Sequence, residues 1–152
     1  MAVQIYLVRH GEAEAGWDVD SDPGLSVRGR EQAQAVRDKL VATGPLPLFS
    51  SPLLRAQQTA QPLAHAWHAA VTLEPAFREI PAPAHLDMQD RIGWLLSVRD
   101  LDWSQADSEL WQWRDVIVSR LASLQSPTVI FTHFMVLNLV AGLASGCSQL
   151  VH

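Results

Sequence analysis

Five side chains that can do chemistry follow the ends of predicted strands. The first two directly follow the apolar run 3–8, and the last directly follows the β-branched run 128–132. Because the carboxyl ends of parallel strands meet at one edge of a sheet, we expect the five side chains to converge. They are Arg9, His10, Arg55, Glu79 and His133.

This set of residue types suits phosphoryl transfer. Arginine forks match the geometry of phosphate oxygens and stay charged at any relevant pH. A neutral imidazole is a competent nucleophile near pH 7, and the set holds two, His10 and His133. A carboxyl group with a raised pKa can protonate a departing alkoxide, and Glu79 supplies a carboxyl group to the set.

The elements that must position these residues alternate between strands and helices. Strands are predicted at 3–8, 46–49, 71–73 and 128–132, and the last residues of the chain are predicted to form a further short strand. Helical spacing of apolar residues is found between these runs. The alternation predicts an α/β fold with three layers, α/β/α, and a mainly parallel central sheet. The run 3–8 has few polar residues, which favours a central strand.

Local signals set the expected helix ends. Ser26 is the expected N-cap of the first helix, which ends near Gly44 and Pro45. Ser51 is the expected N-cap of the second helix, with Pro52 at its first position, and this helix is expected to run to about Ala69.

Residues 86–124 are predicted to form two helices broken near 100–107. We interpret this stretch as a helical cap that precedes the last main strand and belongs to the same single domain, 1–152. Four tryptophans lie in the cap and are interpreted as packing residues: Trp94, Trp103, Trp111 and Trp113. The apolar run 134–144 is predicted to be the last helix.

Composition narrows the class of protein. The chain has 152 residues and a net charge of −5, which argues against nucleic acid or an anionic membrane as the main partner. No apolar run approaches the roughly 20 residues of a membrane helix. Cys147 is the one cysteine, so an intramolecular disulfide is impossible and a cytoplasmic location is expected. His65 and His68 are interpreted as surface residues rather than metal ligands.

Several motifs together resemble the histidine phosphatase superfamily, which includes the phosphoglycerate mutases. The resemblance covers nearly the whole chain, and four motifs and a final strand occur in the family's order. They are Leu7-Val8-Arg9-His10-Gly11-Glu12, then Leu25-Ser26 with Gly29, Gln32 and Ala33, then Ser51-Pro52-Leu53-Leu54-Arg55-Ala56 with Thr59 and Ala60, and Phe77-Arg78-Glu79, followed by the last strand from Val129 to His133.

The resemblance implies a specific mechanism. His10 would be the nucleophile and pass through a phosphohistidine. Arg9, Arg55 and His133 would bind the phosphoryl group, and Glu79 would be the general acid and then the base that activates water. It also implies a phosphoglycerate mutase-like fold that uses no metal ion and no cofactor.

Two positions depart from the family pattern. Gly16 stands where the mutases carry an asparagine that helps to hold phosphate, and Phe134 stands where glycine usually follows the second histidine. The first departure favours a phosphatase over a mutase.

The sequence therefore predicts a metal-independent phosphatase that hydrolyses a phosphomonoester. The expected partner is a small phosphorylated substrate. Two alternatives share the site: a phosphatase acting on a phosphohistidine protein, and a phosphoglycerate mutase-type phosphotransferase. A third alternative is a non-catalytic module that only binds phosphate.

Overall fold

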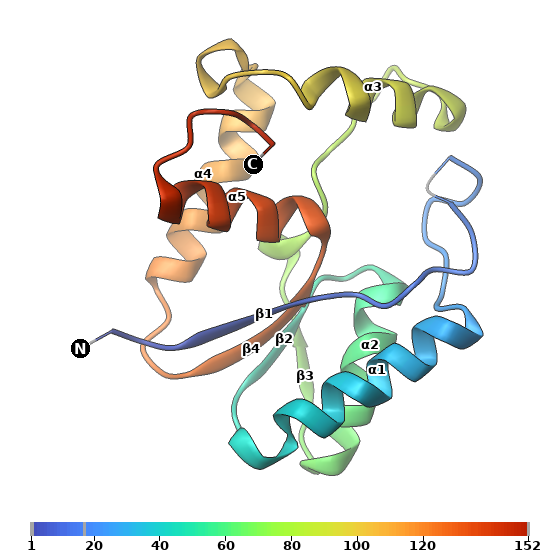
Figure 1. Cartoon of the computed structure of the whole chain (residues 1–152), viewed down its shortest axis with the longest axis vertical. Helices are drawn as coiled ribbons and strands as arrows, with labels where there is room; N and C mark the ends of the chain where they lie inside the picture. Colours follow the sequence, from blue (N-terminus) through green and yellow to red (C-terminus); the bar gives the residue numbers. More distant parts are fainter. Residues whose placement is uncertain (1, 17, 152) are drawn as a thin grey trace.

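The computed structural model describes residues 2–16 and 18–151 (Figure 1). Strands and helices alternate along the chain, with short 3₁₀ helices after the first helix, before Glu79 and within the cap. In chain order the elements that matter below are β1 (Ile5–Arg9), α1 (Val27–Leu40), β2 (Leu48–Ser50), α2 (Leu54–Ala66), β3 (Val71–Leu73), the 3₁₀ helix η2 (Pro75–Phe77), α3 (Arg91–Val98), α4 (Ser108–Ala122), β4 (Thr128–Thr132) and α5 (Phe134–Ser145).

The four strands form one parallel sheet in the order β1-β4-β2-β3. Strand β4 is inserted between β1 and β2, with Thr128 opposite Ile5 and Val129 opposite Leu48. All five residues of β4 are buried, because the strand has a neighbour on each side and helices on both faces. The prediction of an α/β fold with a mainly parallel sheet is confirmed.

Helices cover both faces of the sheet, which gives three layers (Figure 1). Successive residues of a strand point to opposite faces, and β4 shows this directly. Val129 and Phe131 pack in a core with α1 and α2, whereas Ile130 packs in a second core with α4 and α5. The apolar character of β4 therefore reflects burial on two faces.

The prediction that the first strand is central is wrong. Among the described residues β1 pairs only with β4 and forms an edge of the sheet. Its side chains are nevertheless half-buried on both faces: Leu7 joins the core with α5, and Val8 joins the core with α1. An apolar run indicates cover on the two faces and carries no information about hydrogen-bonding neighbours at the edges.

The start of the second helix also differs from the prediction. Helix α2 begins at Leu54, so Ser51 is not its N-cap and Pro52 is not its first position. The Leu54 amide instead donates to a carboxylate oxygen of Asp22, 2.8 Å away, from the loop after β1. The helix ends at Ala66, three residues before the expected end. By contrast, the Ser26 hydroxyl caps α1 as predicted, accepting from the Gly29 amide.

The cap contains the two predicted helices, α3 and α4, separated by a 3₁₀ turn. Among the described residues at the end of the chain, up to residue 151, Gln149 forms an isolated bridge with Asp102 in place of the predicted strand. The predicted last helix is present as α5. In the described part of the chain, no helix combines the length and apolar character needed to cross a bilayer.

A close backbone contact fixes the loop after β1 on the first turn of α1. A Cβ atom at Gly11 would lie 2.5 Å from the Gly29 carbonyl oxygen, and one at Gly29 would lie 2.1 Å from the Glu12 carbonyl oxygen. The Ser26 amide donates to that same Glu12 carbonyl at 2.9 Å. Glycine is therefore required at both positions where the loop after His10 packs against α1, because any side chain there would push the loop away from the helix.

We expect Gly29→Ala to lower the free energy of unfolding by about 1–3 kcal/mol, because the new methyl group meets backbone atoms that cannot yield. Gly93→Ala is the matched control, since Gly93 is also helical and a Cβ there meets nothing within 4 Å. It should raise the free energy of unfolding by about 0.5–1 kcal/mol through helix propensity. Urea unfolding of both variants tests this, and equal effects would contradict the steric argument.

Candidate active site

The five predicted residues come from four separate segments of the chain and lie at the carboxyl edge of the sheet. Arg9 ends β1 and His10 follows it; Arg55 lies in the first turn of α2. Glu79 follows η2, and His133 lies between β4 and α5. The structure brings all five together, because each strand of a parallel sheet delivers its following loop to the same edge.

The hydrogen bonds of His10 define which ring nitrogen is free to react. Its Nδ1 lies 2.6 Å from the carbonyl oxygen of Gly11, and a carbonyl can only accept, so Nδ1 carries the hydrogen. The lone pair is therefore on Nε2, which accepts a hydrogen bond from Arg55 Nε at 3.1 Å. Burial, together with the nearby charges of Arg55 and Arg9, lowers the pKa of His10 to about 4, against the hydrogen bond to Gly11. The imidazole is neutral near pH 7.

Arg55 is a buried cation, with a relative exposure of 5%. Its Nη1 has no hydrogen-bond partner among the described residues. Burial lowers the pKa of Arg55, and the carboxylates of Glu79 and Asp22 oppose that change. A buried guanidinium with a donor to spare next to a neutral imidazole is suited to bind an anion.

His133 is fully buried beside His10, with ring centroids 5.2 Å apart. Its Nε2 lies 2.7 Å from the Ser51 hydroxyl oxygen, and its Nδ1 has no hydrogen-bond partner among the described residues. Burial, followed by the charge of Arg55, lowers the pKa of His133 to about 2. The ring is therefore a neutral group facing the same space as His10.

Glu79 has the opposite shift. Burial raises the pKa of its carboxyl to about 7, against hydrogen bonds from the amides of Ile80 and Met135 and the charges of Arg55 and Arg9. The Ile80 amide donates to Oε1 at 3.0 Å. Met135 lies in the first turn of α5, so an N-terminal amide of that helix contacts this carboxylate. Near neutral pH the carboxyl exists in both protonation states.

Arg9 is the exposed member of the set. Its guanidinium lies over the ring of Phe134, 5.3 Å from the ring centroid, and that residue is 44% exposed. The phenylalanine that replaces the family's usual glycine therefore holds Arg9 at the rim of the site by a cation–π contact.

Three residues that support the site were not predicted in these roles. Ser51 bonds His133; Thr59 accepts from the Gly11 amide at 3.0 Å; and Asp22 bonds the first turn of α2. The Thr59 hydroxyl donates to the Arg55 carbonyl at 2.7 Å, so it joins the loop after β1 to α2. Serine and threonine near helix starts are interpreted as caps, and no sequence pattern separates that use from a contact across the sheet.

The described residues include no group of three histidine, cysteine or acidic side chains arranged to hold a metal ion. A cavity of about 700 Å³ opens beside Arg9 and His10, and α1 contributes Gln32 and Lys39 to its lining. The lysine adds a further positive charge next to the end of β1.

We expect Glu79→Gln to change how stability depends on pH. The raised pKa means that the unfolded chain ionises first, so the wild-type free energy of unfolding falls as pH rises from about 4.5 to about 7. The variant lacks this loss, so its stability relative to the wild type should increase by about 3 kcal/mol between pH 4.5 and pH 8. Urea unfolding at pH 4.5, 6 and 8 tests this. A difference that stays constant with pH would contradict a buried carboxyl.

Comparison with known proteins places this geometry in a family. The model of the histidine phosphatase superfamily (branch 1) matches residues 5–149. A probable phosphoglycerate mutase GpmB from Proteus mirabilis is 39% identical over 84 residues, which is 51% of this chain and 38% of that protein. The PE-PGRS family protein PE_PGRS11 of Mycobacterium tuberculosis is 36% identical over 111 residues, which is 68% of this chain and 19% of that protein.

The chain thus spans less than half the length of these curated relatives. Among solved structures, a phosphoglycerate mutase from Thermus thermophilus is similar, with a TM-score of 0.67 and 28% identity over 95% of this chain and 86% of that one. The fold is therefore phosphoglycerate mutase-like, and the chain belongs to the histidine phosphatase superfamily.

Proposed function

We propose that this protein is a metal-independent phosphatase that hydrolyses a phosphomonoester through a phosphohistidine at His10. The observation that carries the proposal is the unprotonated Nε2 of His10, which accepts a hydrogen bond from the buried Arg55 guanidinium at 3.1 Å. An anion drawn to the guanidinium lies next to a neutral nucleophile whose orientation is fixed. Positioning and charge stabilisation are what phosphoryl transfer requires.

In the first step, Nε2 of His10 attacks phosphorus and the bond to the leaving oxygen breaks. Protonated Glu79 gives its proton to that oxygen, so the alcohol leaves neutral. Arg9, Arg55 and His133 donate to the oxygens of the transferring group, and Arg55 Nη1 and His133 Nδ1 are the buried atoms with capacity to do so.

In the second step, water attacks the phosphohistidine. The Glu79 carboxylate formed in the first step takes a proton from that water, the phosphorus–nitrogen bond breaks, and phosphate leaves. A pKa of about 7 suits both halves, since the same group must release and accept a proton at similar pH.

A phosphoglycerate mutase-type reaction is the second candidate, favoured by the GpmB relative and by the Thermus structure. A mutase returns the phosphoryl group to a substrate oxygen, whereas a phosphatase gives it to water. Incubation with a phosphoglycerate separates them: release of inorganic phosphate supports the phosphatase, and an isomeric phosphoglycerate supports the mutase. A phosphohistidine protein is the alternative substrate of a phosphatase, because the same five residues would hold its phosphoryl group.

We expect the protein to release phosphate from p-nitrophenyl phosphate, and His10→Ala to lower kcat by at least about a thousandfold, because the covalent route is lost. His65→Ala is the matched control, since His65 is exposed on α2 and takes no part in the site. Full activity in the His10→Ala variant would rule out the mechanism.

Rapid quenching with ³²P-labelled substrate tests the intermediate. Acid-labile label on the wild-type protein, and its absence from the His10→Ala variant, is the expected result. A protein that binds phosphate without becoming labelled or turning over would instead be a non-catalytic binding module.

We expect kcat/KM for an alkyl phosphate to fall above about pH 7, roughly tenfold per pH unit, as Glu79 loses the proton that the first step uses. Below about pH 4 activity should fall as His10 becomes protonated. Glu79→Gln should be slower and lack the high-pH fall. Ionisation of the substrate affects the wild type and the Glu79→Gln variant equally. If kcat/KM depended on pH in the same way for both proteins, Glu79 would not be the general acid.

A further inference from the structure

We propose that helix α4 of the cap positions the carboxyl group of Glu79, chiefly through the indole N–H of Trp113. The inference deepens the proposed function, on which it rests, by assigning a positioning residue to the general acid. Helix α4 carries none of the five site residues, yet it contacts the segment that leads to Glu79 at two points.

The first contact lies next to the acid itself. Nε1 of Trp113 donates to the carbonyl oxygen of Arg78 at 3.1 Å. This carbonyl belongs to the peptide group that joins Arg78 to Glu79, so the hydrogen bond fixes the plane from which the Glu79 side chain departs. Trp113 is only 5% exposed, and water has little access to replace the bond.

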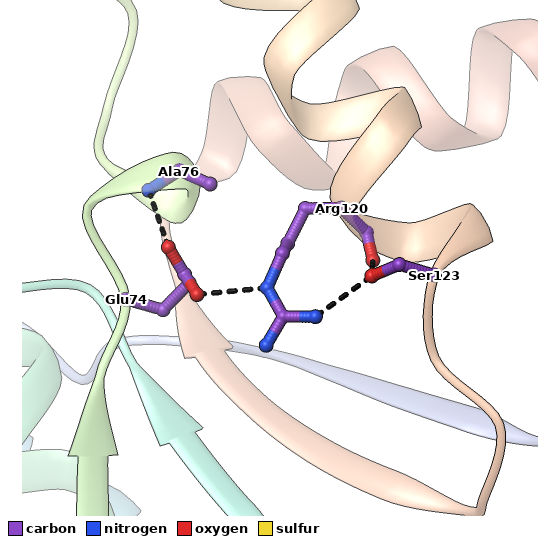
Figure 2. Close-up of polar contacts among 4 residues, drawn as sticks. All are labelled: Glu74, Ala76, Arg120 and Ser123. Carbon is purple, nitrogen blue, oxygen red and sulfur yellow. Dashed lines mark hydrogen bonds and ion pairs between the residues drawn. The ribbon is translucent and has the colours of Figure 1, made fainter.

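The second contact holds the start of the same segment (Figure 2). Arg120 Nε donates to Glu74 Oε2 at 2.8 Å, and the other oxygen of Glu74 accepts from the Ala76 amide at 3.3 Å, which caps η2. Arg120 Nη1 also donates to the Ser123 hydroxyl at 2.7 Å. The guanidinium is therefore oriented from two sides, and it links α4 to the residue that follows β3.

The sheet holds the segment from the other side. The Thr132 hydroxyl donates to the Phe77 carbonyl, and the side chains of Phe77 and Ile80 are fully buried. Two successive carbonyls, those of Phe77 and Arg78, are thus bound by different elements. The contact with Thr132 of β4 fixes the distance between this segment and the sheet. The contact with Trp113 fixes the orientation of the peptide group that precedes Glu79.

Displacement of the Glu79 carboxyl should slow the hydrolysis of some phosphate esters more than others. An alkyl phosphate must leave as a neutral alcohol, so its cleavage depends on a proton delivered at the right place. Nitrophenolate is a good leaving group without protonation. Loss of the Trp113 hydrogen bond should therefore slow the first ester far more than the second, whereas general loss of structure would slow both.

Trp113→Phe tests this, because it removes the indole N–H and keeps an aromatic side chain. We expect kcat/KM for an alkyl phosphate to fall about tenfold, and kcat/KM for p-nitrophenyl phosphate to change less than about twofold. Trp111→Phe is the matched control. Trp111 lies on the same helix and its Nε1 donates to the Trp103 carbonyl at 3.1 Å, within the cap and away from Glu79.

Equal losses on both esters in Trp113→Phe, or the same selective loss in Trp111→Phe, would overturn the proposal. Arg120→Gln covers the case in which Trp113→Phe does not fold, because it removes the tether at Glu74 near the surface. Its loss should be selective for the alkyl ester as well, and smaller, about threefold. A non-selective loss there would count against the proposal.

A titration that needs no activity separates this inference from the proposed function. The Ile80 amide donates to the Glu79 carboxylate, so its ¹⁵N–¹H signal reports ionisation of that group. The groups that face this carboxyl from other elements are Arg9 of β1, Arg55 of α2 and the Met135 amide of α5. In Trp113→Phe the midpoint should fall from about 7 toward the ordinary range of glutamate, as water reaches the loosened carboxyl.

In Trp111→Phe the midpoint should stay at the wild-type value. An unmoved midpoint in Trp113→Phe would overturn the positioning role. A wild type that hydrolyses neither ester would overturn the proposed function, and the titration alone would then decide the role of α4.

Discussion

The buried guanidinium of Arg55 is the charge around which the site is built. The Arg55 side chain is 5% exposed, and its charge shifts the pKa values of the neighbouring site residues. Together with burial, this charge lowers the pKa of His10 and of His133, and it limits the rise in the pKa of Glu79. Charge burial of this kind is costly unless it is paired and hydrogen-bonded. In the proposed reaction, a phosphoryl group bound between these residues would supply negative charge next to the guanidinium.

The sequence predicts the layered fold and the convergence of site residues well, because both depend on local signals. Apolar runs locate the strands, and a strand followed within a few residues by Arg9-His10 or by His133 places those side chains at the carboxyl edge of any parallel sheet. Arg55 lies about one helical turn beyond the end of its strand, so the same argument places it at this edge. Each of these inferences uses the direction of a strand and does not require knowledge of which strands are neighbours.

The contacts that support the site are less predictable, because they join segments far apart in the chain. Ser51 carries the same serine-proline signal whether it caps a helix or bonds His133, 82 residues later. The edge position of β1 depends on where β4 inserts, and the apolar pattern of β1 is the same in either place. The tryptophans of the cap are predicted as packing residues, and Trp113 is one, but its indole N–H has a second use that only the tertiary structure reveals.

The insertion of β4 between β1 and β2 bears on how the molecule assembles. His10 and Arg55 both come from the first half of the chain, yet β1 and β2, the strands that precede them, are not neighbours in the sheet. Strand β4 lies between them and is synthesised much later, because β2 ends at Ser50 and β4 begins at Thr128. Pairings of this sequence separation form late and slowly. A ribosome-bound chain that has not yet released β4 therefore holds His10 and Arg55 on a divided sheet. The edge that carries the proposed site becomes continuous when this strand enters the gap.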